Sequence, residues 1–202
     1  MNGREHKVAG ACAGIAACII LNRYQANSTI QVDTLYVSAL SAATIVTSVA
    51  SSLLPDVDTP NSTVGSKVKP ISHLINKTGG HRGILHYPIF LAIICGLLYY
   101  LYPSIPEGLE RDLYLYVSTG FVVGYLSHII LDMFNSAGIK LLAPFVGFKF
   151  KIPTGLSFGK KGKLISFKYL KGDKIADRCI ANFISISALA IFALYFYGFI
   201  KF

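Results

Sequence analysis

The stretch TLYVSALSAATIVTSVASSLLPDVDTPNS, residues 34–62, decides the fold class of this chain. Residues 34–54 carry no charged side chain. A helix that crosses a bilayer needs ~20 predominantly apolar residues, so this segment is predicted to span a membrane. Two carboxylates, Asp56 and Asp58, follow at the edge of the apolar segment, and their purpose is the first question that the sequence raises.

The composition of the whole chain supports a membrane protein. Hydrophobic residues make up 53% of the 202 residues and charged residues 14%, whereas soluble domains carry about 25% charged residues. The mean hydropathy is +0.54. We therefore expect a single membrane-embedded domain over residues 1–202.

Five apolar segments follow one another along the chain: 8–21, 34–54, 84–102, 113–131 and 183–200. The last four approach or reach the ~20 residues of a membrane-spanning helix. The first holds only 14 residues, so its full crossing stays open. The sequence predicts an all-α integral membrane protein, a helical bundle of four to five transmembrane segments.

The basic residues predict the orientation of this bundle. With five crossings, sixteen of the 19 Lys and Arg residues fall on the side of the N-terminus and three on the other. Because cytoplasmic loops are enriched in Lys and Arg, the N-terminus and both long loops are predicted to be cytoplasmic. The net charge of +9 then reflects the topology of the protein. It also gives the protein some affinity for anionic membrane lipids. We do not expect a nucleic-acid partner.

The last cytoplasmic loop, 132–182, is strongly basic. Within it, FKFKI at 148–152 alternates apolar and basic residues, which is typical of a strand. We expect a small basic β-hairpin or interfacial flap here, which could also bind a protein partner.

Histidines and aspartates collect at the predicted cytoplasmic face. They are His6, Asp56, Asp58, His73, His81, His86, His128 and Asp132. A scatter over all the helix ends would rarely place them on one side, so they are candidate metal ligands. We expect His73 to be solvated and His6 to be an additional ligand or an interfacial histidine.

The segment GYLSHIILDMFNSAG, 124–138, places His128 and Asp132 four residues apart. On a helix these side chains share one face and could chelate one ion. Ionisable residues within a membrane segment are costly and by default functional candidates. The alternative is a structural hydrogen bond between the two. Asn135 follows and could orient a water.

The segment GHRGILH, 80–86, brings His81 and His86 close through a bend at Gly83. Arg82 suits a phosphate oxygen, with the flanking positive charge of a cytoplasmic loop as the alternative. Mixed His and Asp ligands fit Zn²⁺, with Mn²⁺ and Fe²⁺ as alternatives. Asp56 and Asp58 could bridge two ions, or they could be a solvated helix end.

The motifs PDVDTPNS, GHRGILH and GYLSHIILDMFNSAG, in this order, resemble the YdjM-type family. That family is described as inner-membrane-associated, metal-dependent hydrolases and also carries a LexA-binding label. The family's His-Arg-Gly-x-Thr-His-Ser core has Leu85 in place of Thr and Tyr87 in place of Ser. A weaker likeness is to zinc phospholipase C and P1 nuclease.

The resemblance implies a metal site and a plasma-membrane location with the site on the cytoplasmic side. Its ligands would be His6, Asp56, Asp58, His81, His86, His128 and Asp132. Asp58, Arg82 and His86 are the candidate catalytic residues. The leading prediction is a hydrolase of phosphoesters, in particular lipid-linked ones, that uses a metal-activated water. A metal-stabilised scaffold and a metal-ion transporter are the alternatives.

Overall fold

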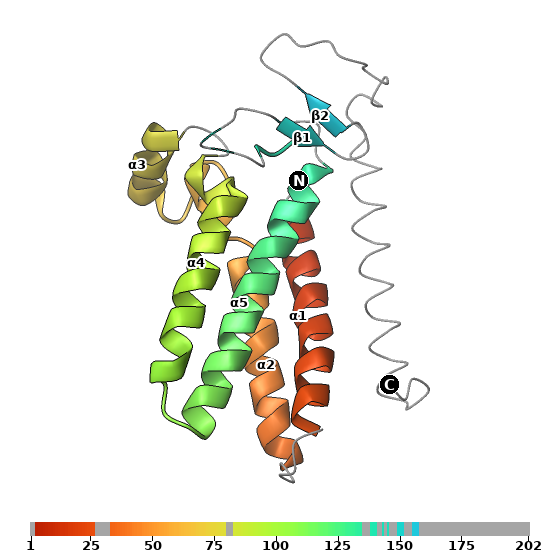
Figure 1. Ribbon diagram of the computed structural model, residues 1–202. Helices are drawn as coiled ribbons and strands as arrows, with labels where there is room; N and C mark the ends of the chain where they lie inside the picture. The colour runs from red at the N-terminus through yellow and green to blue at the C-terminus, as the bar shows by residue number, and fades with distance from the viewer. Residues whose placement is uncertain are drawn as a thin grey trace.

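The computed structural model describes residues 3–26, 33–79, 83–134, 138–140, 143, 145, 149–151 and 155–157. Four helices in this part of the chain stand side by side (Figure 1). They are α1 (Gly3–Ala26), α2 (Thr34–Ser51), α4 (Pro88–Leu101) and α5 (Leu109–Met133). A shorter helix, α3 (Lys69–Gly79), and three 3₁₀ turns, η1 (Pro55–Asp58), η2 (Ile84–His86) and η3 (Tyr102–Ser104), complete the helical part.

Three of the described helices are long and apolar enough to cross a membrane. They are Gly3–Gln25, Thr34–Asp58, which includes η1, and Leu109–Met133. The membrane-embedded helical class predicted from the sequence is confirmed. The segment 8–21 looked too short, but its polar flanks continue the helix to 24 residues, which is enough to span.

The third predicted segment differs from the expectation. Residues 84–102 were predicted to form one crossing, whereas the α-helix within them, α4, has 14 residues. With η3 the helical stretch covers Pro88–Ser104, which at a rise of 1.5 Å per residue is about 26 Å, less than the ~30 Å hydrocarbon core. Pro88 occupies the first turn, where its missing N–H is tolerated, so the helix begins there. The predicted segment 183–200 lies outside the described residues.

The helices α1, α2 and α5 pack closely against one another, and α4 packs against α5. A Cβ atom added at Gly124 would lie 2.1 Å from the carbonyl oxygen of Ser48, and one at Gly120 would lie 2.4 Å from that of Thr44. Gly10 on α1 has the same role, because a Cβ there would lie 2.6 Å from Ser52 Oγ. Such small residues let membrane helices approach closely. The sequence analysis did not identify these glycines, although their four-residue spacing is a recognisable signal.

Hydroxyl groups of α2 bind the neighbouring helices at this contact. Ser48 Oγ donates a hydrogen bond to the carbonyl of Gly10 at 2.6 Å, and Thr44 Oγ1 donates to that of Tyr116 at 3.1 Å. Both hydroxyl-bearing residues are fully buried. Interhelical hydrogen bonds of this kind stabilise membrane bundles and fix the rotation of each helix.

A polar network closes the end of the bundle where α1 leads into α2. Tyr36 Oη and Gln25 Nε2 donate to Asp112 Oδ2 at 2.8 and 3.1 Å. Tyr116 Oη lies 2.9 Å from Asn22 Oδ1 and 2.8 Å from Gln25 Oε1. The carboxylate of Asp112 therefore has partners from both neighbouring helices.

Two three-residue strands lie in the described part of the last loop. The strand β1 (Lys149–Lys151) pairs antiparallel with β2 (Gly155–Ser157), and Phe150 also bridges to Ile139. Most of the loop 132–182 lies outside the described residues. The basic flap therefore stays a prediction.

Candidate metal centre

The antiparallel course of the helices brings four distant segments to one end of the bundle, next to β1 and β2 (Figure 1). They are the start of α1, the turn η1 after α2, the turn η2 before α4, and the end of α5. The side chains that gather here are His6, Asp56, Asp58, His86, His128 and Asp132. The grouping of these six residues at one end agrees with the sequence analysis.

The cluster is shielded from solvent except at one carboxylate. His6, Asp58, His86, His128 and Asp132 are each at most 3% exposed. The side chain of Asp56 is 20% exposed. Buried ionisable groups are costly unless they are paired or bind metals, so this enclosed cluster requires a specific role.

Three ligand-type atoms converge at the centre of the cluster. His128 Nε2 lies 3.3 Å from His86 Nε2 and 3.8 Å from Asp132 Oδ2. His86 Nε2 lies 3.5 Å from the same oxygen. His128 and Asp132 share a face of α5 because they are one turn apart, as their spacing predicts.

The contact made by the other ring nitrogen of each histidine, Nδ1, determines which nitrogen carries the proton. His128 Nδ1 lies 2.7 Å from the carbonyl oxygen of Ser52, which can only accept a hydrogen bond. His86 Nδ1 lies 3.0 Å from Asp58 Oδ2. In the neutral rings both Nδ1 atoms therefore donate, and both Nε2 atoms present lone pairs to each other. Two facing lone pairs at 3.3 Å need a cation or a proton between them.

The donor set fits a divalent metal. Two nitrogen ligands of a tetrahedral zinc ion at 2.0–2.1 Å lie about 3.3–3.4 Å apart, which is the separation of the two Nε2 atoms. Histidine nitrogens together with a carboxylate suit Zn²⁺, and imidazole also suits iron. His86, His128 and Asp132 thus form one group that could hold an ion.

A second group overlaps the first. It consists of His6, Asp56 and His128. The His6 ring stacks on the His128 ring with centroids 3.8 Å apart, and His128 Nε2 lies 3.9 Å from Asp56 Oδ1. Both groups use His128, whose neutral ring has one lone pair, so the two groups cannot use it for two ions at once.

Asp58 lies behind this centre and in neither group. Its Oδ2 accepts a hydrogen bond from the Gly83 backbone N–H at 2.9 Å and faces His86 Nδ1. Thr59 Oγ1 lies 3.0 Å from its Oδ1. This arrangement differs from the prediction that Asp56 and Asp58 together bridge two ions. The reason is η1, because two residues two apart in a 3₁₀ turn point in different directions.

Three residues of the sequence prediction, His81, Arg82 and Asn135, lie outside the described part of the chain. Their roles stay predictions. His73 is exposed, as expected.

Sequence reasoning missed the Ser52 carbonyl and the Gly83 N–H. Both are backbone groups, and only their position in the fold gives them a role.

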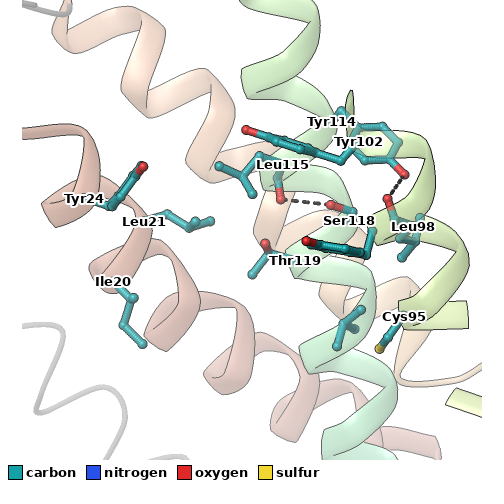
Figure 2. Close-up of a pocket in the computed structure, with 12 residues that line it drawn as sticks. Ile20, Leu21, Tyr24, Cys95, Leu98, Tyr102, Tyr114, Leu115, Ser118 and Thr119 are labelled. Carbon is teal, nitrogen blue, oxygen red and sulfur yellow. Dashed lines mark hydrogen bonds between the residues drawn. The ribbon is translucent and has the colours of Figure 1, made fainter. Parts of the chain in front are cut away.

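A cavity of about 610 Å³ lies elsewhere, between α1, α4 and α5 (Figure 2). Its lining is mostly apolar and aromatic, with Tyr24, Tyr102 and Tyr114 among the contributors. On α5 it spans Tyr114 to Val122, which at 1.5 Å per residue lies about 9–21 Å from His128. The cavity is therefore separate from the metal-ligand cluster.

The fold and the cluster define a class of protein: a multi-helix membrane protein with buried histidines and aspartates at one end of its bundle. The sequence profile of the YdjM inner membrane protein family matches residues 1–201. The chain belongs to this family and is an inner-membrane protein.

Curated relatives agree with this assignment. The inner membrane protein YdjM of Escherichia coli (strain K12) is 41% identical over 103 residues, which is 50% of this chain and 48% of that protein. The uncharacterized protein YvsG of Bacillus subtilis (strain 168) is 32% identical over 92 residues, 46% of this chain and 51% of its own length. The matches thus span about half the length of these relatives. No solved structure matches the chain.

Proposed function

We propose that this protein is a membrane-bound, metal-dependent hydrolase that acts on lipid-linked phosphoesters at the cytoplasmic face. The observation that carries the proposal is the pair of Nε2 atoms of His86 and His128, 3.3 Å apart, with Asp132 beside them. This arrangement suits a divalent cation and is enclosed by the ends of three membrane-spanning helices.

His86, His128 and Asp132 would hold the ion, and His6 and Asp56 are close enough to complete the site. Zinc is the best fit to these donors, with manganese and iron as alternatives. A divalent ion held by these residues would supply a Lewis acid and a bound water with a pKa of about 7, and so a nucleophile at neutral pH.

The surrounding residues position the ligands and limit access. Asp58 holds the His86 ring through Nδ1, and the Ser52 carbonyl holds the His128 ring in the same way. Carboxylate–histidine pairs of this kind orient metal ligands and raise their basicity. Asp56 is the partly exposed member of the six, so it marks the side from which substrate reaches the centre. Arg82 is proposed to bind the phosphate group.

The position of the centre favours a lipid-linked substrate. Asp56 follows directly on the apolar segment of α2, at the end of a candidate span. A phosphate group at the membrane surface can reach this depth while its hydrocarbon chain stays in the bilayer. The basic residues on the same side of the predicted topology would attract such anionic groups.

The test is metal analysis followed by turnover. We expect purified wild-type protein to retain a transition metal, and His128→Ala and Asp132→Asn to lose it. Asp112→Asn is the matched control, because Asp112 is a carboxylate of the same helix, paired in the polar network far from the cluster. Phosphate release from phospholipids or polyprenyl phosphates should follow metal content across these proteins.

A structural role for the metal is the second candidate. The ligands come from α1, η1, η2 and α5, so a bound ion would tie the bundle together without any reaction. Metal-loaded protein that is inert towards every phosphoester would favour this scaffold role. A protein that binds no transition metal would contradict both candidates. Ion uptake into proteoliposomes that depends on Asp58 would instead favour a transporter.

A further inference from the structure

The helix α3 presents three distinct faces. It is strongly amphipathic and runs over eleven residues, Lys69–Gly79, within what the sequence indicated to be a loop. Successive residues on a helix are 100° apart, so each side chain can be assigned to a face.

One face fixes α3 to the metal-ligand region. Ser72 is fully buried, and Asn76 Nδ2 donates a hydrogen bond to the carbonyl oxygen of Asp58 at 2.8 Å. These residues are four apart and lie on the same side of the helix. The helix is therefore packed against η1, which carries Asp56 and Asp58.

A second face is apolar and uncovered. Ile71 is 55% exposed and Leu74 is 67% exposed. They are three residues apart and so lie on the same side, turned away from the contact with η1. Figure 1 shows α3 to one side of the long helices, at the end of the bundle where η1 lies. This is the end of the bundle at which the candidate span Thr34–Asp58 finishes.

The third face is basic. Lys69, His73 and Lys77 follow one another at four-residue spacing, and all three are exposed. Lys67 precedes the helix, and residues 67–79 contain no Asp or Glu. An apolar face beside a cationic face, on a short helix at the edge of a membrane bundle, is typical of a helix that lies in the bilayer interface.

We propose that α3 is an interfacial helix that binds anionic lipid. Ile71 and Leu74 enter the boundary between headgroups and acyl chains, and Lys69 and Lys77 contact lipid phosphates. The charge of the third face favours a lipid surface over a protein partner, because this end of the bundle is predicted to be cytoplasmic and the cytoplasmic leaflet is anionic. This inference does not depend on the hydrolase activity.

The chain contains no tryptophan, so one introduced residue gives an unambiguous fluorescence signal. The full-length Leu74→Trp variant is reconstituted in phosphatidylcholine vesicles that contain phosphatidylglycerol. We expect emission shifted to the blue and quenched by phospholipids brominated near the glycerol. The matched control, His73→Trp, places the reporter on the basic face and should emit at longer wavelength with weaker quenching.

The lipid preference is tested with headgroup-labelled quenchers. Nitroxide-labelled phosphatidylglycerol should quench the His73→Trp reporter several-fold more than nitroxide-labelled phosphatidylcholine at equal mole fraction. Adding Lys69→Gln and Lys77→Gln should remove this difference.

Two results would overturn the proposal. Water-like emission from Leu74→Trp without quenching would place the apolar face in solvent. Blue-shifted emission that brominated lipids do not quench would place it against a second copy or another protein.

Discussion

At the scale of single residues, Asp58 lies in the cluster that the sequence predicts, but it contacts a potential ligand and belongs to neither ligand group. Its carboxylate contacts His86 Nδ1 and the Gly83 N–H, and it is fully buried. Asp56, two residues earlier, belongs to a potential ligand group. The motif Asp-x-Asp thus supplies one carboxylate in a potential ligand group and one that orients the His86 ring.

The first prediction separates these two roles. Asp58→Asn keeps the shape of the side chain but weakens the hold on His86, so metal affinity should fall about 10–100-fold while binding remains detectable. Isothermal titration with zinc measures the change. Asp132→Asn should weaken binding further because it removes a ligand, and Asp112→Asn should leave it unchanged. Equal losses in Asp58→Asn and Asp132→Asn would make Asp58 a ligand.

At the scale of helices, the contact of α2 with α5 sets the position of the centre. Ser52, which holds His128, follows α2, and His128 itself belongs to α5. Any change that separates these two helices therefore moves a ligand away from the group that orients it. Gly124 lies at their closest approach.

The second prediction tests that contact. Gly124→Ala would place a methyl group 2.1 Å from the Ser48 carbonyl, so α2 and α5 must separate. We expect a loss of about 1–3 kcal/mol in stability, typical of overpacking, together with reduced metal content. Thermal unfolding in detergent and metal analysis provide the measurements.

Gly96→Ala is the control for this change. Within the described part of the chain, a Cβ at Gly96 on α4 meets nothing within 4 Å, so the same substitution there should not lower the unfolding temperature. Equal behaviour of the two variants would contradict the packing explanation.

At the scale of the whole molecule, the chain folds back on itself so that alternate connections lie at opposite ends. The cluster of potential metal ligands occupies one end, and the network around Asp112 occupies the other. Two predictions belong to this scale, one about the orientation of the bundle in the membrane and one about the effect that a bound ion would have on stability.

The third prediction concerns orientation. In a variant without native cysteines, Glu107→Cys should react with a membrane-impermeant maleimide in intact cells, because the loop before α5 is predicted to be external. Ser66→Cys, in the exposed loop before α3, should react only after the membrane is opened. The reverse pattern would place the cluster outside and contradict the bias in Lys and Arg.

The fourth prediction concerns the ion as a link between segments. Since the potential ligands come from four parts of the chain, removing metal should lower the unfolding temperature. A ligand at 100 times its dissociation constant contributes about 2.7 kcal/mol to stability. Chelation followed by zinc addition should lower and then restore the transition of wild-type protein. The His128→Ala variant should show no such response, and a response there would place the stabilising ion elsewhere.

The sequence by itself determined the class of the fold and the end of the bundle that carries the site. Apolar segments of membrane length were enough for the first, because a bilayer permits few alternatives to helices. The alternation of the crossings determined which end carries the site, because it places His6, Asp56, His86, His128 and Asp132 at the same end. The four-residue spacing of His128 and Asp132 also predicted their shared face.

Only the tertiary structure decided which of these residues are potential metal ligands and which orient the ligands. Packing between distant segments decides four features of the structure. They are the direction of a side chain in a 3₁₀ turn, the length of α4, the faces of α3 and the backbone groups that orient the histidines. The glycines of α5 set the distance between α2 and α5. The Ser52 carbonyl and the Asp58 carboxylate accept hydrogen bonds from Nδ1 of His128 and His86, which leaves the two Nε2 atoms facing each other. These contacts join residues 28 and 76 positions apart, and no local pattern in the sequence encodes them.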